Sequence, residues 1–221
     1  MQRLEREQLR PFQVGLPLDF LETYQRGVLA YTYRGIPCLK SPLDLAIYMR
    51  ALWDEKPRTI IEIGSKFGGS ALLFCDLART FALGAAVVSI DLRRPSEPPD
   101  CEARFLEGDV KNLDPVFAEH DLFSLPRPWF VVEDSAHTYD GCMAALGFFR
   151  RYFKPGEMLV IEDGVLSDLG LAREYSGGPN RAIADFFAHD PSAFEVVSDY
   201  TDTFGVNATY NPNGYLRRAA G

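Results

Sequence analysis

Residues 59–70 read TIIEIGSKFGGS and join an apolar run to a glycine-rich segment. Its first five residues are mostly apolar and β-branched, as is typical of a buried strand. The three glycines that follow allow the backbone to turn sharply and to approach a ligand closely. A helix that starts directly after such a turn presents unpaired N–H groups, which favour negatively charged ligand groups. The stretch therefore predicts a strand, a ligand-binding turn and a helix in succession.

The same alternation of short apolar runs and helical stretches continues along the chain. Strands that alternate with helices and are apolar on both faces form parallel sheets, so we expect one doubly wound α/β domain. The predicted strands are residues 59–63, 86–92, 103–106, 129–132, 158–161 and 194–198. The predicted helices are residues 70–80, 139–153 and 180–189, with a further helix at 43–53 ahead of the first strand.

The first 56 residues do not follow this alternation. We interpret them as a helical extension of the main domain, which spans residues 57–221. Their apolar side chains need a surface to cover, so we expect the extension to lie over the sheet or at the contact of a homo-oligomer. Residues 199–214 are polar and predict a long loop, and long loops in compact domains are often functional.

The composition excludes several classes of protein. Lysine and arginine number 23 against 31 aspartates and glutamates, so the net charge of −8 disfavours nucleic acid as a partner. The four cysteines form no CxxC pair, which predicts neither a zinc site nor a disulfide framework. The densely charged N-terminus leads into no apolar signal segment, and no apolar run is long enough to span a membrane. We expect a cytoplasmic protein.

The residues after the first two strands predict a cofactor site. The glycine spacing is not G-x-G-x-x-G, which argues against a nicotinamide dehydrogenase. An acid two positions before the first glycine is instead typical of proteins that bind S-adenosylmethionine, and an acid at the end of the next strand can accept hydrogen bonds from ribose hydroxyls. An ordinary tight turn and a turn-capping aspartate remain alternatives. The predicted cofactor-binding residues are Glu62, Gly64, Ser65, Gly68, Gly69, Ser70, Asp91 and Asp109.

Two near-copies of one phrase predict a metal site. VVED ends at Asp134 and VIED ends at Asp163, each at the carboxyl end of a predicted strand. If the two strands are neighbours, their ends lie about 5 Å apart. Carboxylates at that distance repel one another unless they take up protons or hold a cation, and hard oxygen ligands suit Mg²⁺, Mn²⁺ or Ca²⁺. Two independent solvated strand ends would be the alternative, and either Glu133 or Asp134 could face the metal.

His137 follows Asp134 by three residues, at the start of a predicted helix. A histidine beside an activated hydroxyl is a suitable general base, because imidazole exchanges protons near neutral pH. A single histidine is more often structural, but its position next to a predicted metal ligand favours the catalytic interpretation. His120 and His189 lie in or beside predicted helices and away from the predicted metal ligands, and we interpret them as surface or packing residues.

Taken together, an ordered set of motifs resembles the cephalosporin hydroxylase / rhamnosyl O-methyltransferase family, and it is also similar to macrolide sugar O-methyltransferases. The motifs are YRGIP at 33–37 with Lys40 and Pro42, IEIG at 61–64, GGS at 68–70, SID at 89–91, GD at 108–109, DSAH at 134–137, IED at 161–163, GP at 178–179 and NPNGYL at 211–216. They extend over most of the chain.

The resemblance implies a Rossmann-like class I methyltransferase with a mostly parallel seven-stranded sheet, ended by an antiparallel strand at 214–217. It implies S-adenosylmethionine as cofactor, Mg²⁺ or Mn²⁺ held by Asp134, Glu162 and Asp163, and His137 as base. Two features depart from the family pattern. Glu133 replaces an apolar residue, and the residues after His137 match poorly, so the acceptor side of the site is expected to differ.

These observations predict a metal-dependent O-methyltransferase that acts on a hydroxyl of a small natural product, one that carries a sugar. Two alternatives stay open beside it. One is a hydroxylase component, although no signature of haem, flavin or a two-histidine iron site is visible. The other is a non-catalytic protein that binds S-adenosylmethionine on the same scaffold, since a fold does not fix a function.

Overall fold

The computed structural model describes residues 9–220. Residues 1–8 of the predicted extension, and Gly221, lie outside this range. A seven-stranded sheet has the order β5-β4-β3-β6-β7-β9-β8, and a two-stranded sheet pairs β1 with β2. The strands are β1 Thr32–Tyr33, β2 Ile36–Pro37, β3 Thr59–Ile63, β4 Ala86–Asp91, β5 Arg104–Glu107, β6 Trp129–Glu133, β7 Met158–Ile161, β8 Phe194–Val196 and β9 Tyr215–Arg218.

The first five strands of the large sheet in chain order, β3 to β7, pair with one another in parallel. β9, the last strand in the sequence, runs antiparallel to both β7 and β8, as the family resemblance implied. The burial of every residue of β3, β6 and β7 explains why these strands consist of almost continuous apolar runs. The predicted mostly parallel seven-stranded sheet is confirmed.

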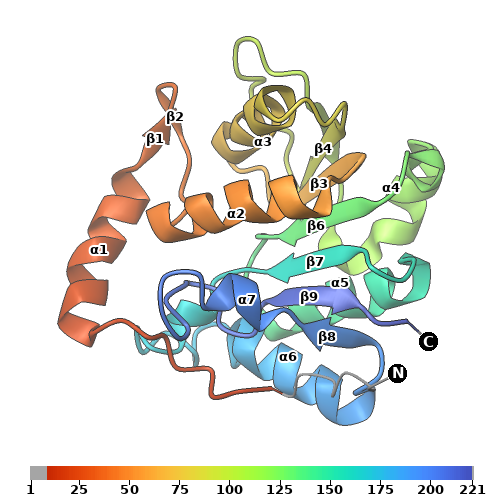
Figure 1. Ribbon diagram of the computed structural model, residues 1–221. Helices are drawn as coiled ribbons and strands as arrows, with labels where there is room; N and C mark the ends of the chain where they lie inside the picture. The colour runs from red at the N-terminus through yellow and green to blue at the C-terminus, as the bar shows by residue number, and fades with distance from the viewer. Residues whose placement is uncertain (1–8, 221) are drawn as a thin grey trace.

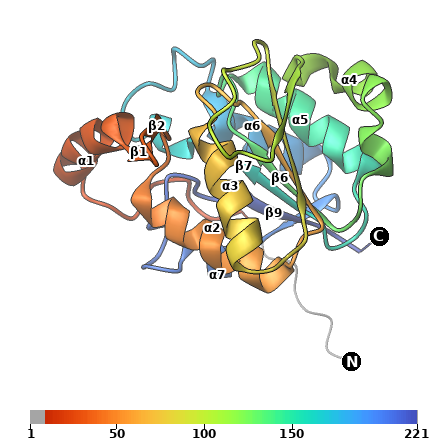
Figure 2. The same cartoon turned by 90° about the horizontal axis from the view of Figure 1, so that it is seen from above.

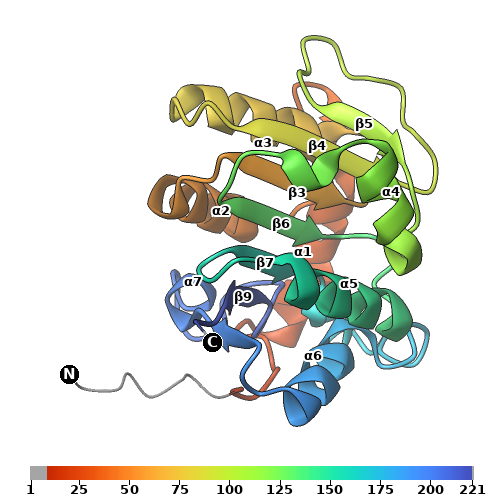
Figure 3. The same ribbon diagram turned by 90° about the vertical axis from the view of Figure 1, so that its right-hand side faces the viewer.

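The helices cover both faces of this sheet. They are α1 Leu18–Ala30, α2 Pro42–Glu55, α3 Gly69–Thr80, α4 Leu113–Glu119, α5 Tyr139–Tyr152, α6 Gly178–His189 and α7 Ser198–Thr201, with short 3-10 turns η1 Val110–Asn112, η2 Leu122–Ser124 and η3 Gly164–Leu166. α2 and α3 lie on one face, and α4, α5 and α6 on the other (Figures 2 and 3). Each face has its own apolar core. No described helix has the length and apolar character to cross a membrane.

The two helices of the N-terminal segment, α1 and α2, occupy different places: α2 lies in the core, and α1 lies near the carboxyl ends of the central strands. α2 packs into the apolar core beside β3 and α3, so the predicted extension and the predicted main domain share one core. α1 stands at the side toward which the arrowheads of β6 and β7 point (Figure 1). The position of α1 is compatible with a cover over the sheet end, and the homo-oligomer stays a prediction.

Three details differ from the predicted elements. Residues 32–37 form the small hairpin β1–β2, which was not among the predicted strands. Gly35, with φ +82°, lets the chain turn between the two strands. α4 was not predicted, since its seven residues are too short for a clear helical period. The sixth strand ends at Val196 rather than at Ser198, where α7 begins.

The predicted loop at 199–214 is polar but largely buried from residue 207 onward. A buried carboxylate explains how a polar loop can be buried. Asp44 of α2 accepts hydrogen bonds from the Thr209 hydroxyl, from the Tyr210 N–H at 2.9 Å and from the Tyr215 hydroxyl at 3.0 Å. Side chains that are hydrogen-bonded in this way can be buried at little net cost. Asp44 therefore fixes the end of the chain against α2.

We expect Asp44→Asn to lower the free energy of unfolding by about 3 kcal/mol, because an amide cannot accept all the hydrogen bonds that the carboxylate accepts. Urea unfolding followed by circular dichroism measures this loss. Asp54→Asn, at an exposed position of the same helix, is the matched control and should change stability by less than about 0.5 kcal/mol. Equal stability of the two variants would show that Asp44 does not anchor the loop.

Candidate active site

The turn after β3 depends on glycine at two points of close approach. Gly64 has φ +110°, and a Cβ there would lie 2.0 Å from the carbonyl oxygen of Asp134. A Cβ at Gly69 would lie 2.2 Å from the carbonyl oxygen of Pro37. Any side chain at these positions would therefore push the turn away from β6 or from β2. These two contacts require glycine for packing within the protein, and the predicted close approach to a ligand stays a prediction.

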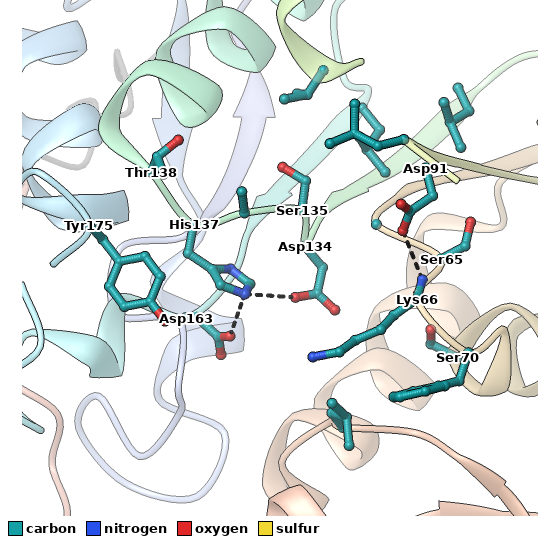
Figure 4. Close-up of a pocket in the computed structure, with 18 of the residues that line it drawn as sticks. Ser65, Lys66, Ser70, Asp91, Asp134, Ser135, His137, Thr138, Asp163 and Tyr175 are labelled. Carbon is teal, nitrogen blue, oxygen red and sulfur yellow. Dashed lines mark hydrogen bonds and ion pairs between the residues drawn. The ribbon is translucent and has the colours of Figure 1, made fainter. Parts of the chain in front are cut away.

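A cavity of about 500 Å³ opens at the carboxyl ends of the central strands, where ligands bind in open α/β sheets. Its size is within the usual range for small-molecule sites. Figure 4 shows residues of the turn, of β4 and of the loop after β6 around it. The predicted site residues that line it are Gly64, Ser65, Ser70, Asp91, Asp109, Asp134, His137 and Asp163.

Two carboxylates border the end of the cavity near β4 and β5. Asp91 accepts hydrogen bonds from the backbone N–H groups of Lys66, at 2.8 Å, and Arg93, at 3.2 Å. Asp109 accepts one from the N–H of Lys111, at 2.9 Å. Both aspartates therefore cap turns, the alternative that the sequence left open for them. Both side chains nevertheless also line the cavity. Capping and ligand binding are therefore compatible here.

Glu62 lies behind the turn rather than in the cavity lining. It is fully buried, and its Oε2 accepts a hydrogen bond from the Ser89 hydroxyl at 2.5 Å. Ser89 also bonds the hydroxyl of Ser65, at 2.6 Å. Burial raises the pKa of Glu62, while nearby Lys40 lowers it. Gly68 and Gly69, likewise predicted to bind the cofactor, do not belong to the cavity lining and instead shape the start of α3.

Asp134, His137 and Asp163 converge at the other end of the cavity (Figure 4). The His137 Nε2 lies 3.4 Å from Asp163 Oδ2 and 3.9 Å from Asp134 Oδ1. One ligand atom from each of the three side chains falls within 4.8 Å of the others, a group that could hold a metal ion. His137 and Asp163 both have positive φ, +52° and +62°, a strained backbone that is common at functional sites.

The electrostatics of this group fit a cation site. Burial raises the pKa of Asp163 to about 6, although the neighbouring His137 opposes the shift. Of the two acids that end β6, Asp134 faces the cavity. Glu133 is fully buried, where it accepts a hydrogen bond from the Ser135 N–H at 3.2 Å and one from the Cys142 thiol at 3.5 Å. Asp134, and not Glu133, therefore faces the candidate metal site.

Glu162, predicted to bind the metal, is turned toward α2. Its Oε1 lies 2.7 Å from the Nζ of Lys40 and accepts a hydrogen bond from the Tyr48 hydroxyl. Lys40 is only 2% exposed and also forms an ion pair with Asp134. Burial lowers the pKa of Lys40, but the carboxylates around it raise that pKa well above its usual value. The structure thus brings His137, rather than Glu162, together with Asp134 and Asp163.

The sequence interpretation missed Lys40 and Tyr48 as site residues. Lys40 belongs to the motif at 33–42 that resembles the family. The motif drew attention to Lys40, but it did not indicate what the lysine does. Tyr48 lies in an ordinary helical apolar pattern. Neither residue could be placed beside Glu162 without the packing of α2 on the sheet.

Solved structures show the fold of this chain in other proteins. One described as "CmcI-N160 apo-structure" has a TM-score of 0.70 at 23% identity and covers 98% of this chain and 90% of its own. Another, "cmcI-D160 Mg-SAM", has a TM-score of 0.69 at 24% identity, with the same coverage. CalS11, described as a TDP-rhamnose 3'-O-methyltransferase, has a TM-score of 0.54 at 17% identity, over 94% of this chain and 88% of its own. The predicted class I methyltransferase fold is confirmed.

Curated proteins and a family model extend the comparison to the sequence. "Rhamnosyl O-methyltransferase" of Mycobacterium tuberculosis (strain ATCC 25618 / H37Rv) is 28% identical over 192 residues, 85% of this chain and 78% of its own. The protein of the same name from Mycobacterium leprae (strain TN) is 29% identical over 191 residues, 85% of this chain and 82% of its own. The predicted enzyme class, an S-adenosylmethionine-dependent methyltransferase, is confirmed. Since the family model "Rhamnosyl O-methyltransferase/CmcI" matches residues 25–219, this chain belongs to that family.

Proposed function

We propose that the protein transfers a methyl group from S-adenosylmethionine to a hydroxyl of a small, sugar-bearing natural product, with Mg²⁺ or Mn²⁺ at the active site. The observation that carries this proposal is the convergence of Asp134, His137 and Asp163 on the cavity that Asp91 and the Gly64 turn also line. One cavity thus joins a candidate cofactor end to a candidate cation end.

The cofactor fits the end near β4. The carboxylate of Asp91 is available to ribose hydroxyls, as acids at this strand end are in nucleotide-binding folds. Asp109 lies beyond it and is available to the adenine amino group. The turn residues Gly64 and Ser65 and the start of α3 at Ser70 would face the amino acid part of the cofactor. A cofactor bound in this way would present its methyl group toward the acidic end.

The donor set at the opposite end fits a hard divalent cation. Carboxylate oxygens are the ligands that Mg²⁺ and Mn²⁺ prefer, and Asp134 and Asp163 would supply them. Glu162 adds negative charge behind Asp134 and is itself held by Lys40 and Tyr48. When bound, the cation would lower the pKa of the substrate hydroxyl.

His137 is positioned to take the proton from that hydroxyl. Its Nε2 faces the carboxylate of Asp163 at 3.4 Å, which stabilises the imidazole after it has gained a proton. The group contains one histidine and two carboxylates, unlike the two histidines and one carboxylate of oxygen-activating iron sites. This donor set favours methyl transfer over the hydroxylase alternative.

The names of the relatives support the acceptor class. The mycobacterial relatives are described as rhamnosyl O-methyltransferases, and they match most of this chain. We therefore propose a rhamnosyl or related sugar hydroxyl as acceptor. Methyl transfer to 4-nitrophenyl α-L-rhamnopyranoside, followed by mass spectrometry, is the direct assay. A protein that binds S-adenosylmethionine but methylates no glycoside would support the non-catalytic alternative.

Asp91→Ala should weaken the binding of S-adenosylhomocysteine by about 1–3 kcal/mol, because hydrogen bonds to a charged acceptor are lost. Isothermal calorimetry measures the change. Asp100→Ala, whose side chain is 80% exposed, is the control and should bind normally. Tight binding of NAD in place of S-adenosylhomocysteine would contradict the cofactor assignment.

The affinity for Mg²⁺ should fall as the pH drops through about 6, because Asp163 has its pKa near that value and must lose a proton before it can bind a cation. Calorimetry from pH 5 to 8 gives the profile. Asp163→Asn should bind Mg²⁺ at least about tenfold more weakly throughout and lose this pH dependence. Activity that survives EDTA undiminished would remove the cation from the mechanism.

His137→Ala should lower kcat by about 10²–10⁴, the usual contribution of a positioned proton acceptor, while the affinity for S-adenosylhomocysteine stays the same. His189→Ala, at the exposed end of α6, is the control for loss of a histidine. Rescue of the variant by excess Mg²⁺ would instead assign His137 as a metal ligand. A wild-type kcat would exclude both roles.

A further inference from the structure

The cavity has a side that neither the proposed cofactor nor the proposed cation residues use. α1 contributes Gln25 and Val28 to it, the η3 region contributes Leu166, and the loops contribute Tyr175 and Tyr210. α1 borders the carboxyl ends of the strands in Figure 1. Since the acceptor must lie next to His137, this side is where the acceptor would bind if the proposed function holds.

Tyr210 presents a buried hydroxyl without a partner. The side chain is 3% exposed, and its hydroxyl has no hydrogen bond to any residue in the described part of the chain. The backbone around it is fixed, because its N–H bonds Asp44 and its carbonyl accepts from the Val165 N–H, both at 2.9 Å. Its ring packs edge-on against Tyr24 at 5.7 Å. The side chain of Tyr210, which lines the cavity, is therefore held in place.

Gln25 presents a second unpaired group on the same side. Its Oε1 is buried and has no hydrogen-bond partner within residues 9–220. Gln25 directly follows Tyr24, the residue that packs on Tyr210. Val28 and Leu29, three and four positions further along α1, line the same cavity, so Gln25 lies on the face of α1 that points into it.

Two unpaired polar groups in one cavity indicate a ligand. Native proteins leave few buried polar atoms without a partner, and those that remain call for an explanation. Burial raises the pKa of Tyr210, so the hydroxyl stays protonated near neutral pH and can donate a hydrogen bond. Gln25 can both donate and accept through its amide. Both groups are uncharged, which suits the hydroxyls of a sugar better than a phosphate.

The apolar neighbours suit the other surface of a sugar ring. Val28 and Leu166 are buried and border the cavity. The ring of Tyr175 lies beside His137, with the two ring centres 6.0 Å apart (Figure 4). A pyranose carries hydroxyls at its edge and C–H groups on its faces, so it requires both kinds of contact.

We propose that Gln25 and Tyr210 form the acceptor subsite and bind the hydroxyls of a pyranose next to the one that His137 deprotonates. Tyr175, Val28 and Leu166 cover a face of that ring. The two polar residues then decide which sugar hydroxyl reaches the methyl group. α1 thereby acts as a wall of the active site, and this assignment rests on the proposed function.

Binding of 4-nitrophenyl α-L-rhamnopyranoside to the protein with S-adenosylhomocysteine and Mg²⁺ tests the subsite, by calorimetry or by saturation-transfer NMR. Tyr210→Phe and Gln25→Leu should each weaken rhamnoside binding about tenfold, the effect of losing one hydrogen bond to a buried partner. S-adenosylhomocysteine affinity should not change. In an assay of transfer, KM for the rhamnoside should rise more than kcat falls.

Stability separates the proposed role from a structural one. Tyr210→Phe removes a hydroxyl that has no partner, so the unfolding midpoint should stay the same or rise. Tyr152→Phe, at a distant hydroxyl bonded to Asp114, and Arg26→Leu, at an exposed position of α1, are the matched controls and should bind the rhamnoside normally.

Normal rhamnoside binding by both variants, or a lower unfolding midpoint for Tyr210→Phe, would overturn the subsite. A wild-type protein that binds S-adenosylhomocysteine but no rhamnoside would overturn it as well. A wild-type protein that binds the rhamnoside through these residues but transfers no methyl group would keep the subsite and refute the proposed function.

Discussion

The contact between the end of β3 and the end of β6 is the constraint on which the site depends. The Asp134 N–H donates to the carbonyl of Ile63 at 2.8 Å, and the Gly64 N–H donates to that of Ile90 at 2.7 Å. Because Gly64 has no side chain, the turn can press against the backbone of Asp134. The turn that lines the candidate cofactor end and the loop that carries Asp134 are therefore held together by backbone hydrogen bonds rather than by mobile side chains.

The site also places several carboxylates close together, and their mutual repulsion would destabilise the fold without a positive charge between them. Lys40, buried between Asp134 and Glu162, supplies one positive charge. A buried charge is tolerated only when it is paired, so Lys40 and the two acids depend on one another. Lys40 and Tyr48 both come from the N-terminal segment, and so does Gln25. The part of the chain outside the strand–helix alternation thus contributes partners of Asp134 and Glu162 and part of the cavity lining.

The sequence predicted those features that depend on local pattern. The buried runs of the central strands, the glycine turn, and Asp134, Asp163 and His137 at strand ends follow from spacing and from the rule that parallel strands place their ends together. The hairpin β1–β2 and the short α4 have weak local patterns, and they were missed. Which of Glu133 and Asp134 faces the cavity depends on the direction of a single residue, and the sequence did not determine it.

Features that depend on long-range packing could not be read from the sequence. Lys40 and Tyr48 meet Glu162 across more than a hundred residues of chain, and Gln25 joins Tyr210 at the cavity only through the docking of α1. The polar loop near the C-terminus was predicted from its composition, but its burial was not, because that burial depends on hydrogen bonds to Asp44. In each case a tertiary contact, not a local preference, decides the position of the side chain.

The proposed methyl transfer requires one cavity to hold a sulfonium cofactor and a divalent cation together. A crystal structure with S-adenosylhomocysteine and Mn²⁺, in which anomalous scattering locates the metal, tests this most directly. We expect the nucleoside at Asp91 and a single Mn²⁺ peak bound to Asp134 and Asp163, next to His137. A cofactor bound at Asp91 without any Mn²⁺ at these acids, or with Mn²⁺ only elsewhere, would contradict the account.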